Sequence, residues 1–96
     1  MKSLQEKVLR LVSQISRGKV STYKEIAKEA GSPRAWRAVG NVLNKNRDPK
    51  IPCHRVIRSD SKVGGYRHGT KRKIALLKKE GIIINSHGKA TQRFRK

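Results

Sequence analysis

The sequence predicts one small domain that is mainly α-helical. Its 96 residues fit a single domain, and the 34% of hydrophobic residues are enough for a small helical core. Apolar side chains recur every three or four residues, which places them on one face of a helix. Glycines and helix-capping residues separate these stretches, so the boundaries between helices can also be predicted.

The first two helices are predicted from apolar spacing and from capping residues. The residues on one face of the first helix are Leu4, Val8, Leu11, Val12 and Ile15. This helix ends before Gly18, which suits a left-handed backbone conformation. Thr22, followed three residues later by Glu25, forms a capping box that starts the second helix. The second helix stops at Gly31.

Ser32-Pro33 predicts the start of a third helix, which extends to about Asn44, because serine caps helices and proline suits the first turn. Its apolar positions are Ala35, Val39 and Val42, with Trp36 and Leu43 beside them, and its polar face carries Arg34, Arg37, Asn41 and Asn44. Two helices joined by a short turn, with Arg and Asn facing outward on the second, indicate a DNA-binding helix-turn-helix. A helical hairpin with a merely polar outer face is the alternative.

The second half of the chain predicts a wing and a last helix. The turn residues 59–61 and the extended residues 63–66 favour a small β-hairpin. A helix is expected over residues 71–80, with Ile74 and Leu77 inward and Gly81 as its stop. The predicted fold class is a mainly α winged helix-turn-helix: a three-helix core, a small β-hairpin and a C-terminal helix. We expect one domain over residues 1–85, with a short strand beginning near residue 82, and a basic tail over residues 86–96.

The charge of the chain indicates a polyanionic partner. It has 25 Lys and Arg residues against 6 Asp and Glu, a formal net charge of +19. Ribosomal and chromatin proteins share such a charge, and a solvated basic surface is the alternative. No apolar run is long enough for a membrane span, and the N-terminus lacks a secretory signal. A lone cysteine fits a reducing compartment, so we expect a cytoplasmic protein, nucleoid-associated in a prokaryote.

The segment Pro52-Cys53-His54-Arg55-Val56 is the candidate for chemistry. A thiolate is the nucleophilic form of cysteine, and neighbouring cations or a histidine raise the thiolate fraction. A buried cysteine that acts as a small apolar side chain is the alternative.

Five motifs together resemble the methylated-DNA–protein-cysteine methyltransferases, also called O6-alkylguanine-DNA alkyltransferases. They are Arg17-Gly18-Lys19-Val20-Ser21-Thr22-Tyr23, Arg37-Ala38-Val39-Gly40, the cysteine motif, Val63-Gly64-Gly65-Tyr66 and Lys79-Glu80-Gly81. They occur in the family's order and near its spacing over roughly residues 3–85, the family's C-terminal catalytic domain. The resemblance implies that Cys53 accepts the alkyl group, that His54 relays the thiol proton, and that Glu80 hydrogen-bonds the histidine.

The resemblance also implies how DNA is held. Tyr23 helps rotate the target nucleotide and donates a proton to guanine N3, and Arg37 enters the duplex in place of the base. Asn41 lies on the same outward face, and Leu43 lies where the family has an apolar pocket or wedge side chain. Tyr66 resembles a wall of the base pocket, and the carbonyl groups of Cys53 and Val56 would accept from the guanine amino group.

One departure concerns the asparagine that braces the active-site turn. The family places it eight residues before the cysteine, whereas Asn46 is seven residues before Cys53. Asn46 is the predicted brace, with Asn44 as the alternative. The chain begins at the first helix of the catalytic core, without the N-terminal domain that holds zinc in some members. No zinc, other metal or cofactor is therefore expected.

The expected function is repair of double-stranded DNA that contains O6-alkylguanine. As in the family, the alkyl group moves to Cys53 in one in-line displacement, each protein acts once, and base flipping exposes the lesion. We expect a monomer with no membrane association. The first alternative is an alkyltransferase-like protein that binds the lesion without transfer, and the second is a basic DNA-binding or ribosomal protein.

Overall fold

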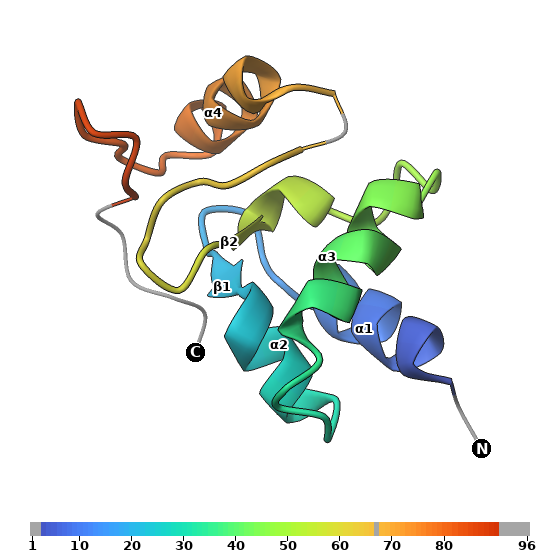
Figure 1. Cartoon of the computed structure of the whole chain (residues 1–96). Coiled ribbons are helices and arrows are strands. Elements are labelled where there is room, and N and C mark those ends of the chain that lie inside the picture. The colour runs from blue at the N-terminus through green and yellow to red at the C-terminus, as the bar shows by residue number, and fades with distance from the viewer. Residues whose placement is uncertain (1–2, 67, 91–96) are drawn as a thin grey trace.

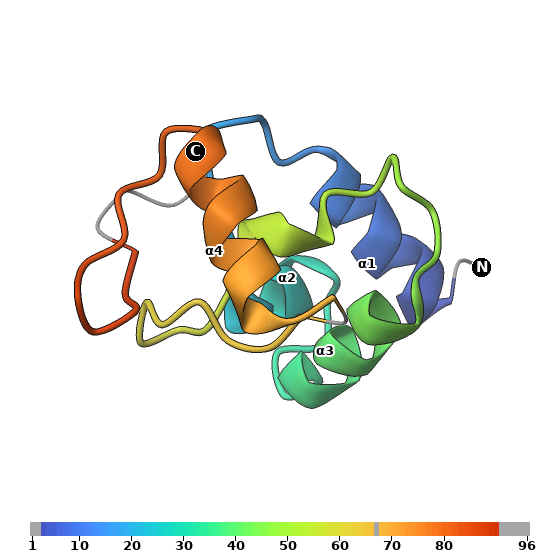
Figure 2. The ribbon, with the colours of Figure 1, turned by 90° about the horizontal axis from the view of Figure 1, so that it is seen from above.

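The computed structural model describes residues 3–66 and 68–90 of the chain. Within these residues the elements are α1 (Leu4–Ser13), β1 (Ser21–Thr22), α2 (Tyr23–Glu29), α3 (Trp36–Lys45), the 3-10 helix η1 (Cys53–Arg55), β2 (Val56–Ile57) and α4 (Thr70–Lys79). Helices α1, α2 and α3 form one group, and α4 lies apart from them with η1 in between (Figure 1), while the view from above shows α4 passing over η1 and α2 (Figure 2). The predicted mainly helical fold class is confirmed.

Helix α1 begins with a capping box that the sequence analysis did not identify. The Ser3 hydroxyl accepts a hydrogen bond from the Glu6 N–H at 3.2 Å, and the Glu6 side chain faces back to the backbone of Ser3. After the helix, Gly18 has the predicted left-handed conformation, with φ of +83°. A Cβ atom there would lie 3.3 Å from the carbonyl oxygen of Glu80. Glycine therefore lets the chain pass close to the end of α4.

The helix-turn-helix is formed by α2 and α3, but α3 begins later than predicted. Thr22 caps α2 as expected, since its hydroxyl accepts from the Glu25 N–H at 3.0 Å. Ser32 does not cap α3. Its N–H donates to the Ala27 carbonyl while Gly31 adopts a left-handed φ, which is the Schellman ending of α2. Residues 33–35 then form a turn, so α3 begins at Trp36.

The main apolar core lies between α1, α2 and α3 and closes against β2. Its buried members are Val8, Val12, Ile15, Ile26, Ala27, Ala30, Val39, Leu43 and Val56. Each helix contributes residues three or four positions apart, as the sequence spacing predicted. This core fixes α3 against α1 and α2, and leaves the opposite face of α3 exposed.

The strands differ from the predicted hairpin. β2 pairs in parallel with β1, with Ser21 opposite Val56 and Thr22 opposite Ile57. The predicted turn at residues 59–61 is present, because the Ser61 N–H donates to Arg58 and the Arg58 N–H to Lys62. Residues 63–66, however, form no strand with β2. The parallel pair places the start of α2 beside the end of β2, the strand that directly follows η1.

Helix α4 covers a second, smaller apolar cluster made of Val20, Ile57, Val63, Leu77, Ile82 and Ala90. Gly81 ends the helix in a left-handed conformation, as predicted. The expected strand near residue 82 is limited to isolated bridges, Ile84 with Ala90 and Lys62 with Lys89. Ala90 is buried, so the chain is packed up to this residue. A domain boundary at residue 85 stays a prediction, and residues 91–96 of the expected tail lie outside the described residues. No described helix is long and apolar enough to cross a membrane.

Candidate active site

Cys53 is the first residue of η1, a single turn held by backbone hydrogen bonds. The Cys53 N–H donates to Ile51, and the Arg55 N–H donates to Pro52. The Val56 N–H donates to the Cys53 carbonyl and leads directly into β2. Cys53 is half-buried and its thiol is not in a disulfide. The turn therefore presents the thiol at the junction of the two helical parts of the molecule.

Asn46 binds the sulfur atom from the end of α3. Its Nδ2 lies 3.3 Å from the Cys53 Sγ and 3.2 Å from the Asp48 carbonyl oxygen, to both of which it donates. Its Oδ1 accepts from the Asp48 N–H at 3.2 Å. The backbone of Asn46 is extended and is fixed by its own N–H bond to Val42. The structure thus places Asn46, rather than the exposed Asn44 on the helix, against the thiol despite the shorter loop.

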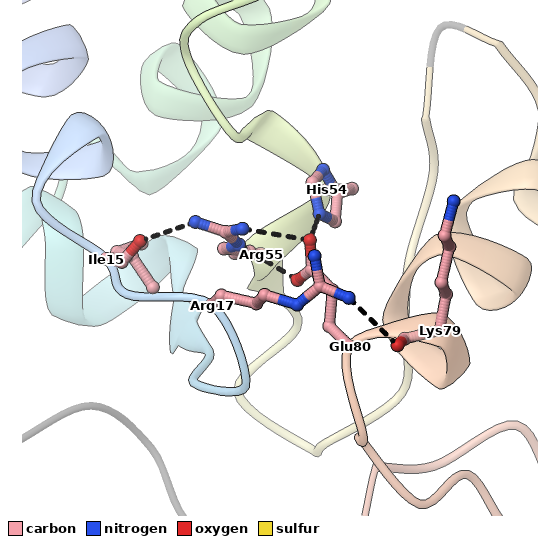
Figure 3. Close-up of polar contacts among 6 residues, drawn as sticks. All are labelled: Ile15, Arg17, His54, Arg55, Lys79 and Glu80. Carbon is pink, nitrogen blue, oxygen red and sulfur yellow. Dashed lines mark hydrogen bonds and ion pairs between the residues drawn. The ribbon is translucent and has the colours of Figure 1, made fainter.

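His54, Arg55 and Glu80 form one ion-pair cluster (Figure 3). The His54 Nε2 lies 2.9 Å from the Glu80 Oε2, as predicted for these two residues. Arg55 donates to both carboxylate oxygens, with Nε to Oε1 and Nη2 to Oε2 at 2.9 Å each. This two-point contact fixes the plane of the carboxylate and therefore the direction from which it meets the imidazole.

The electrostatics of Glu80 favour its charged form. Burial by itself raises the pKa of this carboxyl. Hydrogen bonds from Arg55 and His54, and the charges of these two residues, lower the pKa by a larger amount, so that it lies below its usual value. Glu80 therefore remains a carboxylate that accepts hydrogen bonds and stabilises positive charge on His54.

The cluster is tied to the end of α1 and to the end of α4. The Arg55 Nη1 donates to the Ile15 carbonyl at 2.8 Å, across 40 residues of sequence. The Arg17 Nη2 donates to the Lys79 carbonyl at 3.3 Å (Figure 3). Arg55 thus joins η1 to Glu80 at the end of α4 and to the segment after α1, and Arg17 joins that same segment to α4.

Tyr23 packs against the same apolar core as Cys53 and contacts a buried lysine. The Lys73 Nζ donates to the Val56 carbonyl at 2.7 Å, to the Gly65 carbonyl at 3.1 Å and to the Tyr23 hydroxyl at 3.4 Å. The Tyr23 hydroxyl donates to the Gly65 carbonyl at 3.4 Å. Burial and the negative charge of Cys53 raise the pKa of Tyr23. Tyr23 is therefore a protonated phenol at neutral pH.

A cavity of about 360 Å³ opens beside the thiol. The predicted site residues that line it are Asn46, Cys53, His54 and Tyr66, together with residues 48–52, Arg55, His68, Arg72 and Leu76. The rings of Tyr66 and His68 meet edge to face, with centroids 5.3 Å apart. Val56 is fully buried, and its predicted contribution, the carbonyl group, accepts from Lys73. The volume suits a small organic group next to the sulfur atom.

The outward face of α3 carries two of the three residues of this helix that were predicted to contact DNA. Arg37 and Asn41 are exposed, and the Arg37 guanidinium lies 5.1 Å from the centroid of the Trp36 ring. Leu43 does not share this face. It is 5% exposed and belongs to the main core, one helical turn after Val39. This burial does not fit the predicted contact of Leu43 with DNA, and we assign Leu43 to the core.

Sequence reasoning did not identify Arg55 and Lys73 as site residues. The sequence nevertheless contains a feature that could have indicated each of them. Arg55 is a charge inside the compact segment 51–57, and Lys73 lies one turn before the inward Leu77 on the same helix face. In residues 3–66 and 68–90, no group of three or more His, Cys, Asp or Glu side chains could hold a metal ion.

Known proteins are similar to this chain in sequence and in fold. A methylated-DNA–protein-cysteine methyltransferase of Methanothermobacter thermautotrophicus is 50% identical over 82 residues, which cover 83% of this chain and 45% of that protein. The crystal structure of Mycobacterium tuberculosis OGT in complex with DNA matches with a TM-score of 0.79 and 39% identity, over 84% of this chain and 50% of that chain. That of S. pombe Atl1 in complex with damaged DNA containing O6-carboxymethylguanine matches with a TM-score of 0.79 and 30% identity, over 99% of this chain and 93% of that chain.

The chain spans about half the length of the methyltransferases it matches. The match to the family model, in contrast, covers residues 3–82, which is most of the chain. Together with the identity to the relatives, this match shows that the chain belongs to the family described as the 6-O-methylguanine DNA methyltransferase, DNA binding domain.

Proposed function

We propose that this chain is the catalytic domain of a methylated-DNA–protein-cysteine methyltransferase, which removes the alkyl group from O6-alkylguanine in double-stranded DNA. The observation that carries the proposal is the setting of the Cys53 thiol. It receives a hydrogen bond from Asn46 at 3.3 Å, and it shares the cavity with His54, whose Nε2 is paired with Glu80. A thiol with a donor on the sulfur and a histidine–carboxylate pair nearby is suited to ionisation and nucleophilic attack.

The reaction is one displacement at carbon. His54 takes the thiol proton through water, and Glu80 stabilises the imidazolium ion that forms. The thiolate attacks the alkyl carbon, so that the carbon–sulfur bond forms as the bond from carbon to guanine O6 breaks. The guanine gains one proton at N3 from Tyr23, and the proton held by His54 restores the phenol through solvent. The products are guanine and a thioether, and nothing regenerates the thiol, so each protein reacts once.

Access to the lesion requires the base to leave the duplex, because O6 is stacked inside it. In the proposal, α3 approaches the DNA with its exposed face, Arg37 occupies the space of the flipped base, and Asn41 contacts the strand beside it. Tyr66 and the carbonyl groups of Cys53 and Val56 hold the flipped guanine. The net charge of +19 supports this assignment, since phosphate contacts provide most of the affinity.

Intact-protein mass spectrometry tests the proposal. The protein is mixed with a duplex that contains one O6-methylguanine, and with the same duplex carrying guanine as the control. We expect a gain of one methyl group per molecule at Cys53, no further gain with excess substrate, and no gain for Cys53→Ser. A protein that turns over repeatedly, or a Cys53→Ser protein that still removes the methyl group, would show that the mechanism is wrong.

A second candidate function is lesion binding without transfer. The observation in its favour is the match in fold to S. pombe Atl1, which was solved in complex with damaged DNA containing O6-carboxymethylguanine, with a TM-score of 0.79. The presence of Cys53 argues against it. The same mixture separates the two candidates: a lesion binder forms a complex with the methylated duplex but its mass does not change.

A further inference from the structure

The indole ring of Trp36 is exposed at the start of the helix that the proposed function places on DNA. Trp36 is the first residue of α3, and 39% of its surface is exposed. Over residues 3–66 and 68–90, Ile83 is the one other large apolar side chain that is exposed. A single exposed apolar residue has no significance by itself. The contact that this ring makes, however, indicates a role.

The ring of Trp36 contacts the guanidinium group of its neighbour Arg37. The guanidinium carbon lies 5.1 Å from the centroid of the ring, within the range of a cation–π contact. Consecutive residues of a helix do not face each other, so both side chains must bend along the helix surface to make this contact. Within the part of the chain that the structure describes, the Arg37 side chain has no hydrogen bond or ion pair, so the ring alone restrains it.

A restrained guanidinium group favours the insertion that the proposed function assigns to Arg37. An arginine side chain has many rotamers, and it loses this freedom when it enters a duplex. A contact that limits the rotamers before binding reduces this loss. A carboxylate could also restrain the side chain, but its negative charge would repel the DNA phosphates. The indole ring restrains the guanidinium group without adding a negative charge.

We propose that Trp36 is a positioning residue that holds the Arg37 side chain in the direction in which it enters the duplex, and that the indole ring itself lies at the interface with DNA. The inference deepens the proposed base flipping and rests on the proposed function. A flat apolar ring beside the inserted arginine is suited to pack against a base or a deoxyribose next to the flipped nucleotide. Trp36 and Arg37 then act as one unit.

Tryptophan fluorescence tests where the ring lies. Trp36 is the only tryptophan of the chain, so emission excited outside the absorption of the tyrosines reports this residue alone. The full chain is titrated with a duplex that contains one O6-methylguanine and with the same duplex carrying guanine. Anisotropy of a labelled duplex measures binding independently. We expect the emission to decrease in proportion to the bound fraction, because a base that packs against an indole ring quenches it.

A double-mutant cycle tests the positioning role. The single-turnover transfer rate from the O6-methylguanine duplex is measured for Trp36→Leu, which removes the ring, alone and in an Arg37→Ala background. Trp36→Phe keeps an aromatic ring with a weaker cation–π contact. Ile83→Ala is the matched control, because it removes the other exposed large apolar side chain. Free O6-benzylguanine, which needs no flipping, is the control substrate.

We expect Trp36→Leu to slow transfer from the duplex by about two- to fivefold, which corresponds to a cation–π contact at an exposed site. Trp36→Phe should lose less. In the Arg37→Ala background the change of Trp36 to leucine should have little further effect on the rate. The rate with free O6-benzylguanine and the melting temperature should stay normal, and Ile83→Ala should be normal in every measurement.

Other results would overturn the inference. Unchanged emission with a duplex that anisotropy shows to be bound would place the ring away from the DNA. A normal rate for Trp36→Leu, or an equal loss with and without Arg37, would mean that the ring does not position Arg37. If the unaltered protein gains no methyl group at all, the proposed function itself is wrong. The emission measured on the guanine duplex does not depend on transfer, so the two failures are distinguishable.

Discussion

The two sides of this molecule are held together in different ways. On the side of α1, α2 and α3 the contacts are apolar, and the main core contains no buried charged side chain among its members. On the side of α4 the apolar cluster is smaller, and the junction with η1 depends on Glu80, Arg55 and Lys73. The thiol lies where these two sides meet.

The difference shows that the groups suited to chemistry lie at the polar junction and not in the apolar core. The apolar side provides a rigid frame whose energy does not change with pH or with the state of the thiol. The polar junction is stabilised by groups that also hold and transfer protons. A substitution on the apolar side should therefore change stability without changing the proposed activity. A substitution at the polar junction should change both.

The largest change is expected from the apolar side. Ile26 is fully buried in the main core, so Ile26→Ala should lower the free energy of unfolding by about 4 kcal/mol. Urea unfolding at pH 5 and pH 7 measures this change. The loss should be the same at both pH values, and in the folded fraction the transfer rate should be normal. A loss of unfolding free energy that differs between the two pH values would show that the apolar side also depends on titrating groups.

A somewhat smaller change is expected from the junction. Arg55→Met removes both contacts to Glu80 and the contact to Ile15, which should cost about 3 kcal/mol, because a carboxylate remains with fewer partners. Arg55→Met combined with Glu80→Gln should cost less than the sum of the single changes. Thermal unfolding of the four proteins checks this. Strict additivity would mean that the ion pair contributes little.

A change on the outer face of α3 should affect the proposed reaction on DNA without altering the apolar core or the polar junction. Arg37→Ala should slow transfer from duplex DNA by about tenfold, because flipping a base costs a few kcal/mol. The rate with free O6-benzylguanine, which needs no flipping, should stay normal, and so should the melting temperature. Equal losses on both substrates would assign Arg37 a structural role.

The smallest change concerns acid stability. The pKa of Glu80 is lower in the folded protein than in the unfolded chain. The unfolded state therefore binds the proton more readily, and the contribution of Glu80 to stability is present above its unfolded pKa of about 4.5 and is lost as the pH falls further. Unfolding free energies measured from pH 6 to pH 3 should decrease less steeply for Glu80→Gln. An unchanged slope would mean that other carboxylates dominate acid unfolding.

The comparison also explains how much could be predicted from the sequence. Helices α1, α2 and α4 follow from apolar spacing, from the Thr22 cap and from the glycines at 18, 31 and 81, all of which are local signals. The start of α3 could not be predicted in this way, because the Ser32 N–H bonds the Ala27 carbonyl at the end of α2. Ser32 therefore ends one helix and does not cap the next. A polar residue between two helices can end the first helix or cap the second, and the local sequence does not distinguish the two roles.

Long-range pairing was predicted less well. The parallel contact between β1 and β2 joins two-residue segments that have no alternation pattern, whereas the sequence favours a hairpin between neighbouring segments. The contact of His54 with Glu80 was predicted from family resemblance and not from spacing. Lys73 was missed because a lysine on an apolar face is normally assigned to solvent, whereas here three oxygen atoms surround it.

The cluster around Cys53 has a kinetic consequence. Its key contacts join residues far apart in sequence, with 40 positions between Arg55 and Ile15 and 50 between Lys73 and Tyr23. Closing such long loops is slow compared with forming single helices. We therefore expect the helices to form first during folding and the pocket around the thiol to be completed last. The same contacts would be lost if α4 separated from the other helices, so the proposed nucleophile depends on the docking of α4.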